Sequence, residues 1–160
     1  SWRGRFWLIA ALAPHALYIY PIPMDTLSPT ERSARMARVK GKGSSAEMLV
    51  RRLVHRLGYR YRLHGAKLPG RPDLVFTGRK KVIFVHGCFW HRHPDPDCKL
   101  ARLPKSRHEF WIPKLEGNRA RDLRKLAELE ALGWSALTLW ECGLKDEAFL
   151  ENEIRTFLDS

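Results

Sequence analysis

One stretch, Val82 to His93, constrains this chain more than any other. Its sequence, VIFVHGCFWHRH, begins with the apolar and β-branched residues of a buried strand and then stops at His86 and Gly87. A cysteine, two large aromatic residues and two more histidines follow directly. A strand that only packs in a core does not end in this way. We therefore expect a functional site at the end of this strand.

The flanking sequence predicts an α/β domain with a central mixed β-sheet flanked by helices. The hydrophobic periodicity and the Gly and Pro positions predict strands over 59–64, 74–76, 81–86 and 134–140. The same signals predict helices over 28–40, 45–57, 109–132 and 146–158, the first opening with a capping box at Ser28 and Glu31. The apolar face expected on the second helix consists of Met48, Leu49, Leu53, Val54 and Leu57. Because helices and strands alternate after the 74–86 hairpin, the sheet is expected to contain parallel and antiparallel pairs.

Residues 1–23 differ in character from the rest of the chain. Two arginines precede a short apolar run, as in a secretory signal, but Pro14 ends the run too soon for a bilayer span. The first methionine is Met24. We expect residues 1–23 to be a non-native or disordered extension rather than an export signal, and residues 24–160 to form the functional domain.

The charge of the chain indicates a polyanionic partner. There are 29 Lys and Arg residues against 17 Asp and Glu residues, a net charge of +12. Such an excess favours nucleic acid first and an acidic membrane surface second, and a solvated basic face without a partner is the alternative. The three cysteines are too few for a disulfide scaffold, so we expect reduced thiols in the cytoplasm or metal ligands.

Four residues have the composition of a structural zinc site. Cys88 and His93 are five residues apart, Cys98 is five further on, and Cys142 lies 54 beyond Cys88. Three thiolates and one imidazole fill a tetrahedral zinc shell and leave no position for water. Such a zinc would hold the loop rather than do chemistry. The alternative is three unrelated buried cysteines.

A second set of residues suits phosphodiester hydrolysis. Asp73 follows Pro72 at the head of one hairpin strand, so it is expected close to Val85 and His86 at the end of the other. This layout is similar to the restriction-endonuclease-like core, although the second acid of that core is missing and a histidine replaces its lysine. A carboxylate and a main-chain carbonyl are oxygen ligands that suit Mg²⁺, and a histidine titrates near neutral pH. The alternative is a turn aspartate and an unrelated strand-end histidine.

Phe89 and Trp90 form a candidate DNA contact. Because the two residues are consecutive, a regular strand or helix could not bury both on one face. In a loop held by a metal they can project together, as wedges between base pairs or as stacking platforms. Burial against the zinc site is the alternative.

These motifs together resemble one known family. HGCFWHRH, preceded by LPGRPD and followed by KSRHEFW and LWEC, closely resembles the very short patch repair (Vsr) endonucleases over about Ser28 to Cys142. Those enzymes recognise a T:G mismatch left by deamination of 5-methylcytosine and nick the strand 5′ of the thymine. The resemblance implies a Mg²⁺-dependent, mismatch-specific DNA endonuclease with a structural Zn²⁺. It also implies a monomer that acts on double-stranded DNA with a T:G mismatch, in the cytoplasm and near the nucleoid, beside mismatch-repair proteins and away from membranes.

The resemblance also assigns roles to single residues. Asp73 and the main-chain carbonyl of Val85 would bind Mg²⁺, while Glu47 and His86 would hold water around the ion. The implied proton-transfer histidine is His91, paired with Asp122. The implied zinc ligands are Cys88, His93, Cys98 and Cys142. The implied intercalating residues are Phe89, Trp90 and Trp111.

Two other functions remain open from the residues alone. The same core could belong to a restriction or homing-type nuclease that cuts a sequence rather than a mismatch. A zinc-stabilised DNA-binding module without catalysis would explain the charge and the aromatics. It would not explain why Asp73, His86 and His91 are expected together.

Overall fold

The computed structural model describes residues 28, 30, 31, 34 and 43–160. Within 43–160 the helices and strands are α2 (Ser45–Arg56), β1 (Arg62–Leu63), β2 (Leu74–Phe76), β3 (Lys81–His86), α3 (His108–Ala131), β4 (Ser135–Trp140) and α4 (Glu147–Asp159). Short 3₁₀ turns lie at Thr77–Arg79, Lys99–Ala101 and Glu141–Lys145. None of the helices described is long and apolar enough to cross a membrane.

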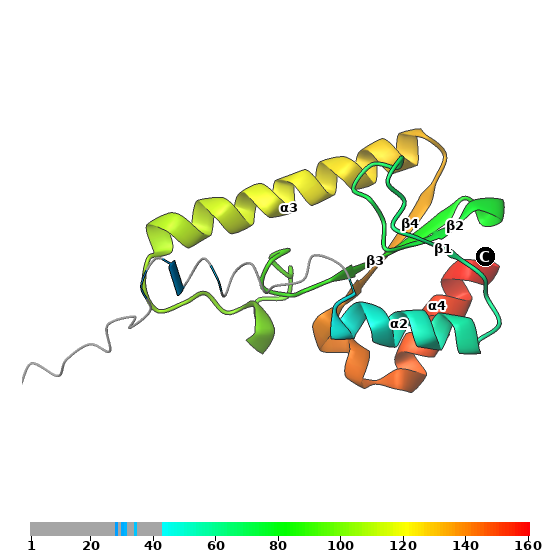
Figure 1. Cartoon of the computed structure of the whole chain (residues 1–160), viewed down its shortest axis with the longest axis horizontal. Helices are drawn as coiled ribbons and strands as arrows, with labels where there is room; N and C mark the ends of the chain where they lie inside the picture. Colours follow the sequence, from blue (N-terminus) through cyan, green and yellow to red (C-terminus); the bar gives the residue numbers. More distant parts are fainter. Residues whose placement is uncertain (1–27, 29, 32–33, 35–42) are drawn as a thin grey trace, which may run out of the picture. The chain divides into compact units, whose positions relative to one another are not determined.

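The four strands form one mixed sheet in the order β1-β2-β3-β4. β2 and β3 are an antiparallel hairpin in which Leu74 pairs with Ile83, and β3 and β4 are parallel, with His86 opposite Trp140. Helix α3 makes the crossover between the two parallel strands (Figure 1). The predicted mixed α/β sheet is thus confirmed.

Helices cover both faces of this sheet (Figure 1). Successive side chains of a strand point to opposite faces, so apolar residues lie on both faces and both need a cover. Leu74 and Ile83 face the core that α2 and α4 complete. Val82 and Phe84 face the opposite way and pack against Leu129 of α3. Each fully buried apolar side chain of this kind contributes about 2 kcal/mol. The two cores fix where the ends of β3 and β4 lie, and the candidate site forms at those ends.

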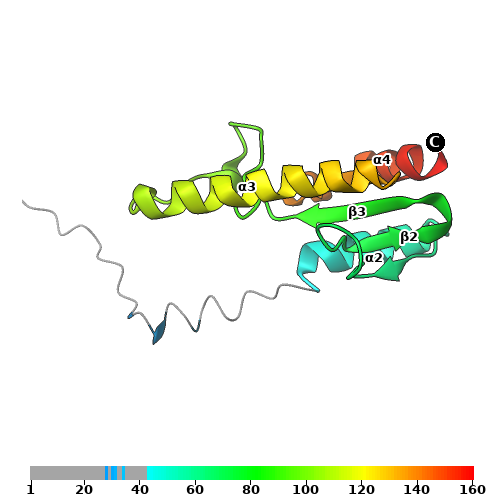
Figure 2. The same ribbon diagram turned by 90° about the horizontal axis from the view of Figure 1, so that it is seen from above.

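Helix α3 is long and only partly buried. Of its apolar residues, Leu115 and Leu129 are fully buried, whereas Leu123 and the capping residue Leu132 are more than half exposed. Pro113 was expected in the first turn, but the helix begins at His108 and therefore contains the proline. The connection from β3 continues beyond the end of the strand to the N-terminal end of α3, and α3 then runs back toward the sheet (Figures 1 and 2). This part of the helix faces the loop after β3 and not the sheet.

Two local predictions were wrong in detail. The strand expected over 59–64 is only Arg62–Leu63, because its partner β2 has three residues and offers little backbone to pair with. On α2 the expected Leu53 and Val54 are buried, but Val50 is buried in place of Leu49, which is 41% exposed. Val50 shares one face with Leu53 and Leu57, and Leu49 lies about 100° away around the helix.

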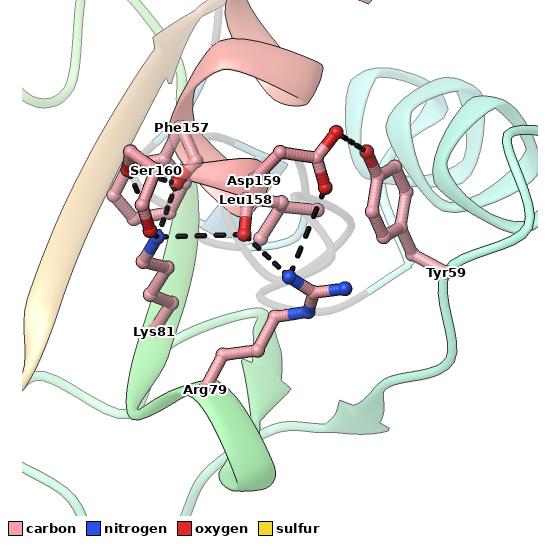
Figure 3. A network of polar contacts seen from close by, with 7 residues as sticks. All are labelled: Tyr59, Arg79, Lys81, Phe157, Leu158, Asp159 and Ser160. Carbon is pink, nitrogen blue, oxygen red and sulfur yellow. Dashed lines mark hydrogen bonds and ion pairs between the residues drawn. The ribbon is translucent and has the colours of Figure 1, made fainter.

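The C-terminal helix is tied to the start of β3 by a buried lysine. The Lys81 ammonium donates to the carbonyl of Phe157 at 2.7 Å and to that of Ser160 at 2.6 Å (Figure 3). Arg79 donates to the carbonyl of Leu158 at 2.7 Å. These carbonyls lie at the C-terminal end of α4, where helix carbonyls lack the backbone N–H partners of the helix interior and a cation is favourable. The network thus anchors α4 against the sheet.

Two predictions fall mainly outside the described residues. These are the helix over 28–40 and the character of residues 1–23. At Ser28 and Glu31 the capping box is present: Ser28 N–H donates to Glu31 Oε2 at 2.8 Å, and Glu31 N–H donates to Ser28 Oγ at 3.2 Å.

Candidate active site

Asp73 lies where the hairpin brings two strand ends together. It precedes β2, and the antiparallel register places it beside the last residues of β3. Its Oδ2 accepts a hydrogen bond of 2.7 Å from the backbone N–H of Val85. Burial raises the pKa of Asp73; the Val85 N–H acts in the opposite direction, and the nearby Glu47 carboxylate raises the pKa further. The carboxylate is therefore oriented and partly desolvated, as a cation ligand in a nuclease would be.

Glu47 approaches Asp73 from the first turn of α2. Glu47 is 3% exposed, and its Oε2 accepts a hydrogen bond of 2.5 Å from the N–H of Gly43. Oε1 lies 3.6 Å from Nε2 of His64. One ligand atom each from Glu47, His64 and Asp73 lies within 4.8 Å of the other two. The structure thus brings two predicted residues together and adds a third, His64.

Sequence reasoning missed His64. It is an isolated histidine in the loop after β1, and its position depends on a left-handed backbone with φ 51°. No sequence pattern marks it, because the left-handed conformation that positions it, uncommon for non-glycine residues, is visible only in the structure.

His86 and His91 form a stacked pair beside this cluster. Their ring centroids are 3.8 Å apart, and the planes differ by 7°. Burial, together with the neighbouring His91, lowers the pKa of His86 to about 4. His86 is therefore neutral at pH 7 and can accept a hydrogen bond there.

Asp122 of α3 holds the second histidine of this pair. Nδ1 of His91 lies 2.7 Å from Oδ2 of Asp122. A carboxylate at Nδ1 favours the proton on that nitrogen, which leaves Nε2 as the proton acceptor. His91 also contributes to the pKa of Asp73, so the histidine pair and the carboxylate cluster are close enough to interact. A base and a cation site side by side are the elements of metal-assisted hydrolysis.

The four predicted zinc ligands lie together just beyond the ends of β3 and β4. The sulfur atoms of Cys88, Cys98 and Cys142 lie within 4.8 Å of one another, and Nε2 of His93 is 3.9 Å from Sγ of Cys142. Zinc–sulfur bonds of about 2.3 Å imply sulfur atoms about 3.8 Å apart, so small shifts would accommodate the ion. The Cys142 N–H donates to Cys88 Sγ at 3.4 Å. The residues present fit a structural zinc.

The parallel register explains why two of these cysteines meet. His86 pairs with Trp140, and Cys88 and Cys142 each follow two residues later. The carboxyl ends of parallel strands meet at one edge, so residues at equal offsets beyond them come together. Burial raises the pKa of the Cys88 thiol to about 12, so this thiol is protonated at neutral pH unless a cation binds it.

The three predicted intercalating residues form one aromatic cluster. The ring centroids of Phe89 and Trp111 are 5.4 Å apart, and those of Trp90 and Trp111 are 6.1 Å apart. All three side chains are half-buried. Asn118 of α3 donates to the carbonyl of Trp90 at 3.0 Å and so fixes the loop against the helix.

Two members of this surface were missed by sequence reasoning. Phe110 is 43% exposed, and its ring centroid lies 5.1 Å from that of Trp111. The Lys114 ammonium lies 5.3 to 6.0 Å from the ring centroids of Phe110, Trp111 and Trp90. The helical spacing of Phe110, Trp111 and Lys114 was visible in the sequence, but their contact with the loop after β3 was not.

A chain with these sites on one sheet edge and a net charge of +12 belongs to the class of DNA-cleaving hydrolases. Residues 24–99 match the family model described as DNA mismatch endonuclease Vsr. The type II nicking enzyme V.XorIIP of Xanthomonas oryzae pv. oryzae is 50% identical over 135 residues, which cover 84% of this chain and 97% of that protein. The DNA mismatch endonuclease Vsr of Escherichia coli K12 is 38% identical over 132 residues, 82% and 83% of the two chains. The type II nicking enzyme V.NmeAIP of Neisseria meningitidis is 35% identical over 130 residues, 81% and 91% of the two.

The chain therefore belongs to the Vsr family of DNA mismatch endonucleases. The resemblance inferred from the motifs is confirmed, and so is the expectation of a DNA endonuclease.

Proposed function

We propose that this endonuclease nicks DNA 5′ of the thymine in a T:G mismatch that arises from deamination of 5-methylcytosine. A divalent cation, Mg²⁺, is required and binds at Asp73. The observation that carries the proposal is the convergence of the Asp73 carboxylate and the His91–Asp122 pair at one sheet edge. Family membership supports it, since one relative carries the name DNA mismatch endonuclease.

The donor set at Asp73 fits a hard cation. Asp73 and the main-chain carbonyl of Val85 would bind Mg²⁺, with Glu47 and His86 holding water around it. The buried Glu47 Oε1 has no hydrogen-bond partner within the part of the chain that the structure describes, as expected of an atom that faces a cation site. When bound, the cation would neutralise charge on the phosphate and lower the pKa of the attacking water.

The protein's own groups orient the reacting side chains and move the proton. The Val85 N–H holds the Asp73 carboxylate in one orientation. Asp122 holds His91 with its proton on Nδ1, so Nε2 takes a proton from the attacking water or relays one to the leaving oxygen. His86 stacks on His91 and limits rotation of the His91 ring. Because His86 is neutral, it places no positive charge beside His91.

The loop after β3 supplies recognition in this proposal. Phe89, Trp90 and Trp111 enter the duplex beside the mismatch, where a mismatched pair is easier to unstack than a matched one. Zinc held by Cys88, His93, Cys98 and Cys142 keeps the loop at a fixed distance from Asp73. The hairpin with its Pro-Asp head and the following crossover helix correspond to a restriction-endonuclease-like core.

We further propose that the endonuclease domain spans residues 24–160 and acts as a monomer in the cytoplasm, near the nucleoid and beside mismatch-repair proteins. The family match begins at residue 24. Gel filtration with light scattering, with and without a mismatched duplex, tests the oligomeric state.

A duplex nicking assay tests the proposed reaction. End-labelled duplexes that differ only in a T:G or T:A pair are incubated with the protein and Mg²⁺ and resolved on a denaturing gel. One cut 5′ of the mismatched thymine, absent from the T:A duplex, is expected. Equal cutting of both duplexes, or none, contradicts the proposal.

The second candidate is nicking at a recognised sequence in matched DNA. Several relatives, including V.XorIIP and V.NmeAIP, are named type II nicking enzymes. A library of matched duplexes distinguishes the two functions, because only the sequence-specific enzyme would cut a fully paired site.

A further inference from the structure

We propose that His64 is a third ligand of the divalent cation bound at Asp73, and that its ring nitrogen makes the site bind Mn²⁺ more tightly than oxygen donors alone would. This assignment rests on the proposed cation at Asp73. It adds a residue that the family resemblance leaves without a role.

Three separate elements bring these side chains together. Glu47 comes from the first turn of α2, His64 from the loop after β1, and Asp73 from the head of β2. One ligand atom from each lies within 4.8 Å of the other two. Ligands at about 2.1 Å from a cation are about 3 Å apart when adjacent and about 4 Å apart when opposite, so the cluster has close to the required size.

An unsatisfied buried oxygen points into this cluster. The Glu47 side chain is 4% exposed, and Oε1 has no hydrogen-bond partner in the described part of the chain. His64 Nε2 lies 3.6 Å and Arg51 Nη1 lies 3.8 Å from this oxygen. Arg51 Nη1 also donates to Met48 Sδ at 3.3 Å. A cation bound by Asp73 and His64 would satisfy this oxygen through a bound water, and leaving it unsatisfied is costly.

The backbone holds the His64 ring on this side. His64 has φ 51°, a left-handed conformation that is uncommon outside glycine. Its N–H donates to the carbonyl of Asp73 at 3.0 Å, and the Gly65 N–H donates to that of Pro72 at 3.0 Å. These bonds extend the pairing beyond β1 and fix His64 directly beside Asp73. A conformation of this kind at a candidate site is consistent with a functional constraint.

The donor type determines which cation the site prefers. Carboxylate and carbonyl oxygens suit Mg²⁺, whereas imidazole nitrogen raises the affinity for first-row transition metals. Replacing His64 by glutamine keeps a polar side chain of similar length but removes the imidazole nitrogen. The ratio of Mn²⁺ to Mg²⁺ affinity therefore reports on the nitrogen donor, which a purely structural role of His64 would not alter.

The test measures cation binding by the full chain loaded with zinc. Free Mn²⁺ is counted by electron paramagnetic resonance, and Mg²⁺ affinity is obtained by competition, for the wild type, His64→Gln, Asp73→Asn and the control His55→Gln on the exposed side of α2. His64→Gln is expected to weaken Mn²⁺ binding about tenfold and Mg²⁺ binding less than about threefold. Spin-echo spectra of bound Mn²⁺ should show nitrogen modulation in the wild type and in His55→Gln, and none in His64→Gln.

Three outcomes overturn the assignment. They are unchanged affinities in His64→Gln, equal weakening for both cations, and nitrogen modulation that is absent from the wild type or persists in His64→Gln. Asp73→Asn separates this result from the proposed function. If it binds both cations as tightly as the wild type, the cation site at Asp73 is wrong; if it loses both while His64→Gln loses neither, only the role of His64 is wrong.

Discussion

The backbone N–H of Val85 donates a hydrogen bond of 2.7 Å to Oδ2 of Asp73. This bond joins the head of β2 to the end of β3 and fixes the carboxylate across the hairpin. A hydrogen bond to a carboxylate lowers its pKa, yet the pKa of Asp73 is raised, because burial outweighs the hydrogen bond. The fold thus orients the Asp73 carboxylate but leaves it poorly solvated. A bound cation would stabilise its negative charge, which water reaches only in part.

Asp73→Asn is expected to abolish nicking and preserve DNA binding. The amide keeps the shape of the side chain but loses the charge that holds the cation, so the single-turnover rate should fall by at least about 10³-fold. The affinity for the mismatched duplex, measured by fluorescence anisotropy, should change less than about threefold because the aromatic cluster is untouched. Asp95→Asn on the exposed loop is the control. A rate within tenfold of the wild type would remove Asp73 from the mechanism.

The rate of nicking at limiting Mg²⁺ is expected to fall as the pH decreases. The raised pKa of Asp73 means that protons compete with the cation at a higher pH than for an ordinary aspartate. The pKa of His86 is about 4, so this histidine stays neutral in that range and does not cause the loss. Rate profiles at several Mg²⁺ concentrations check this, and more Mg²⁺ should move the acid limb to lower pH. An acid limb that is independent of Mg²⁺ would exclude Asp73 as its source.

Asp122→Asn is expected to slow nicking by about 10²- to 10⁴-fold. Without the carboxylate, nothing favours the proton on Nδ1 of His91, and the ring loses the tautomer that leaves Nε2 as the base. Glu116→Gln on the same helix, which breaks the exposed contact with Arg92, is the matched control. Single-turnover rates at saturating Mg²⁺ measure the effect. Equal rates for both variants would contradict a role for the His91–Asp122 pair.

Features that depend on strand register could be predicted from the sequence. The Pro72-Asp73 pair heads one strand and Val85 lies next to the last residue of its hairpin partner, so a short turn suffices to bring them together. Cys88 and Cys142 each follow the end of a strand, and both strands could be predicted from their apolar residues. In these places, the local pattern and the final fold agree.

Features that depend on long-range packing could not be predicted. Leu49 and Val50 are both apolar neighbours on α2, and only the arrangement of the sheet determines that Val50 is buried. The length of β1 follows from the shortness of β2. His64 reaches Asp73 through a left-handed residue that no local pattern indicates, and Lys81 contacts carbonyls 76 or more residues away.

Zinc removal is expected to destabilise the fold. Cys142→Ser should lower the metal content from about one zinc per chain to none and decrease the free energy of unfolding by at least about 3 kcal/mol, because the loop after β3 loses its anchor. Elemental analysis and denaturant unfolding measure the two effects. The control is Ser135→Ala at the start of β4. A zinc-free wild type of equal stability would show that the cysteines pack without a metal.

Lys81→Met is expected to destabilise the protein without affecting catalysis. The substitution removes the charged donor that satisfies the carbonyls of Phe157 and Ser160 at the end of α4, at a cost of about 2 to 3 kcal/mol (Figure 3). Lys81 and His86 are at opposite ends of β3, about 16 Å apart, so the nicking rate per folded molecule should not change. Lys80→Met, next to it and exposed, removes the same charge and should cost less than about 0.5 kcal/mol. Equal unfolding midpoints for the two variants in urea would show that the buried ammonium does not anchor α4.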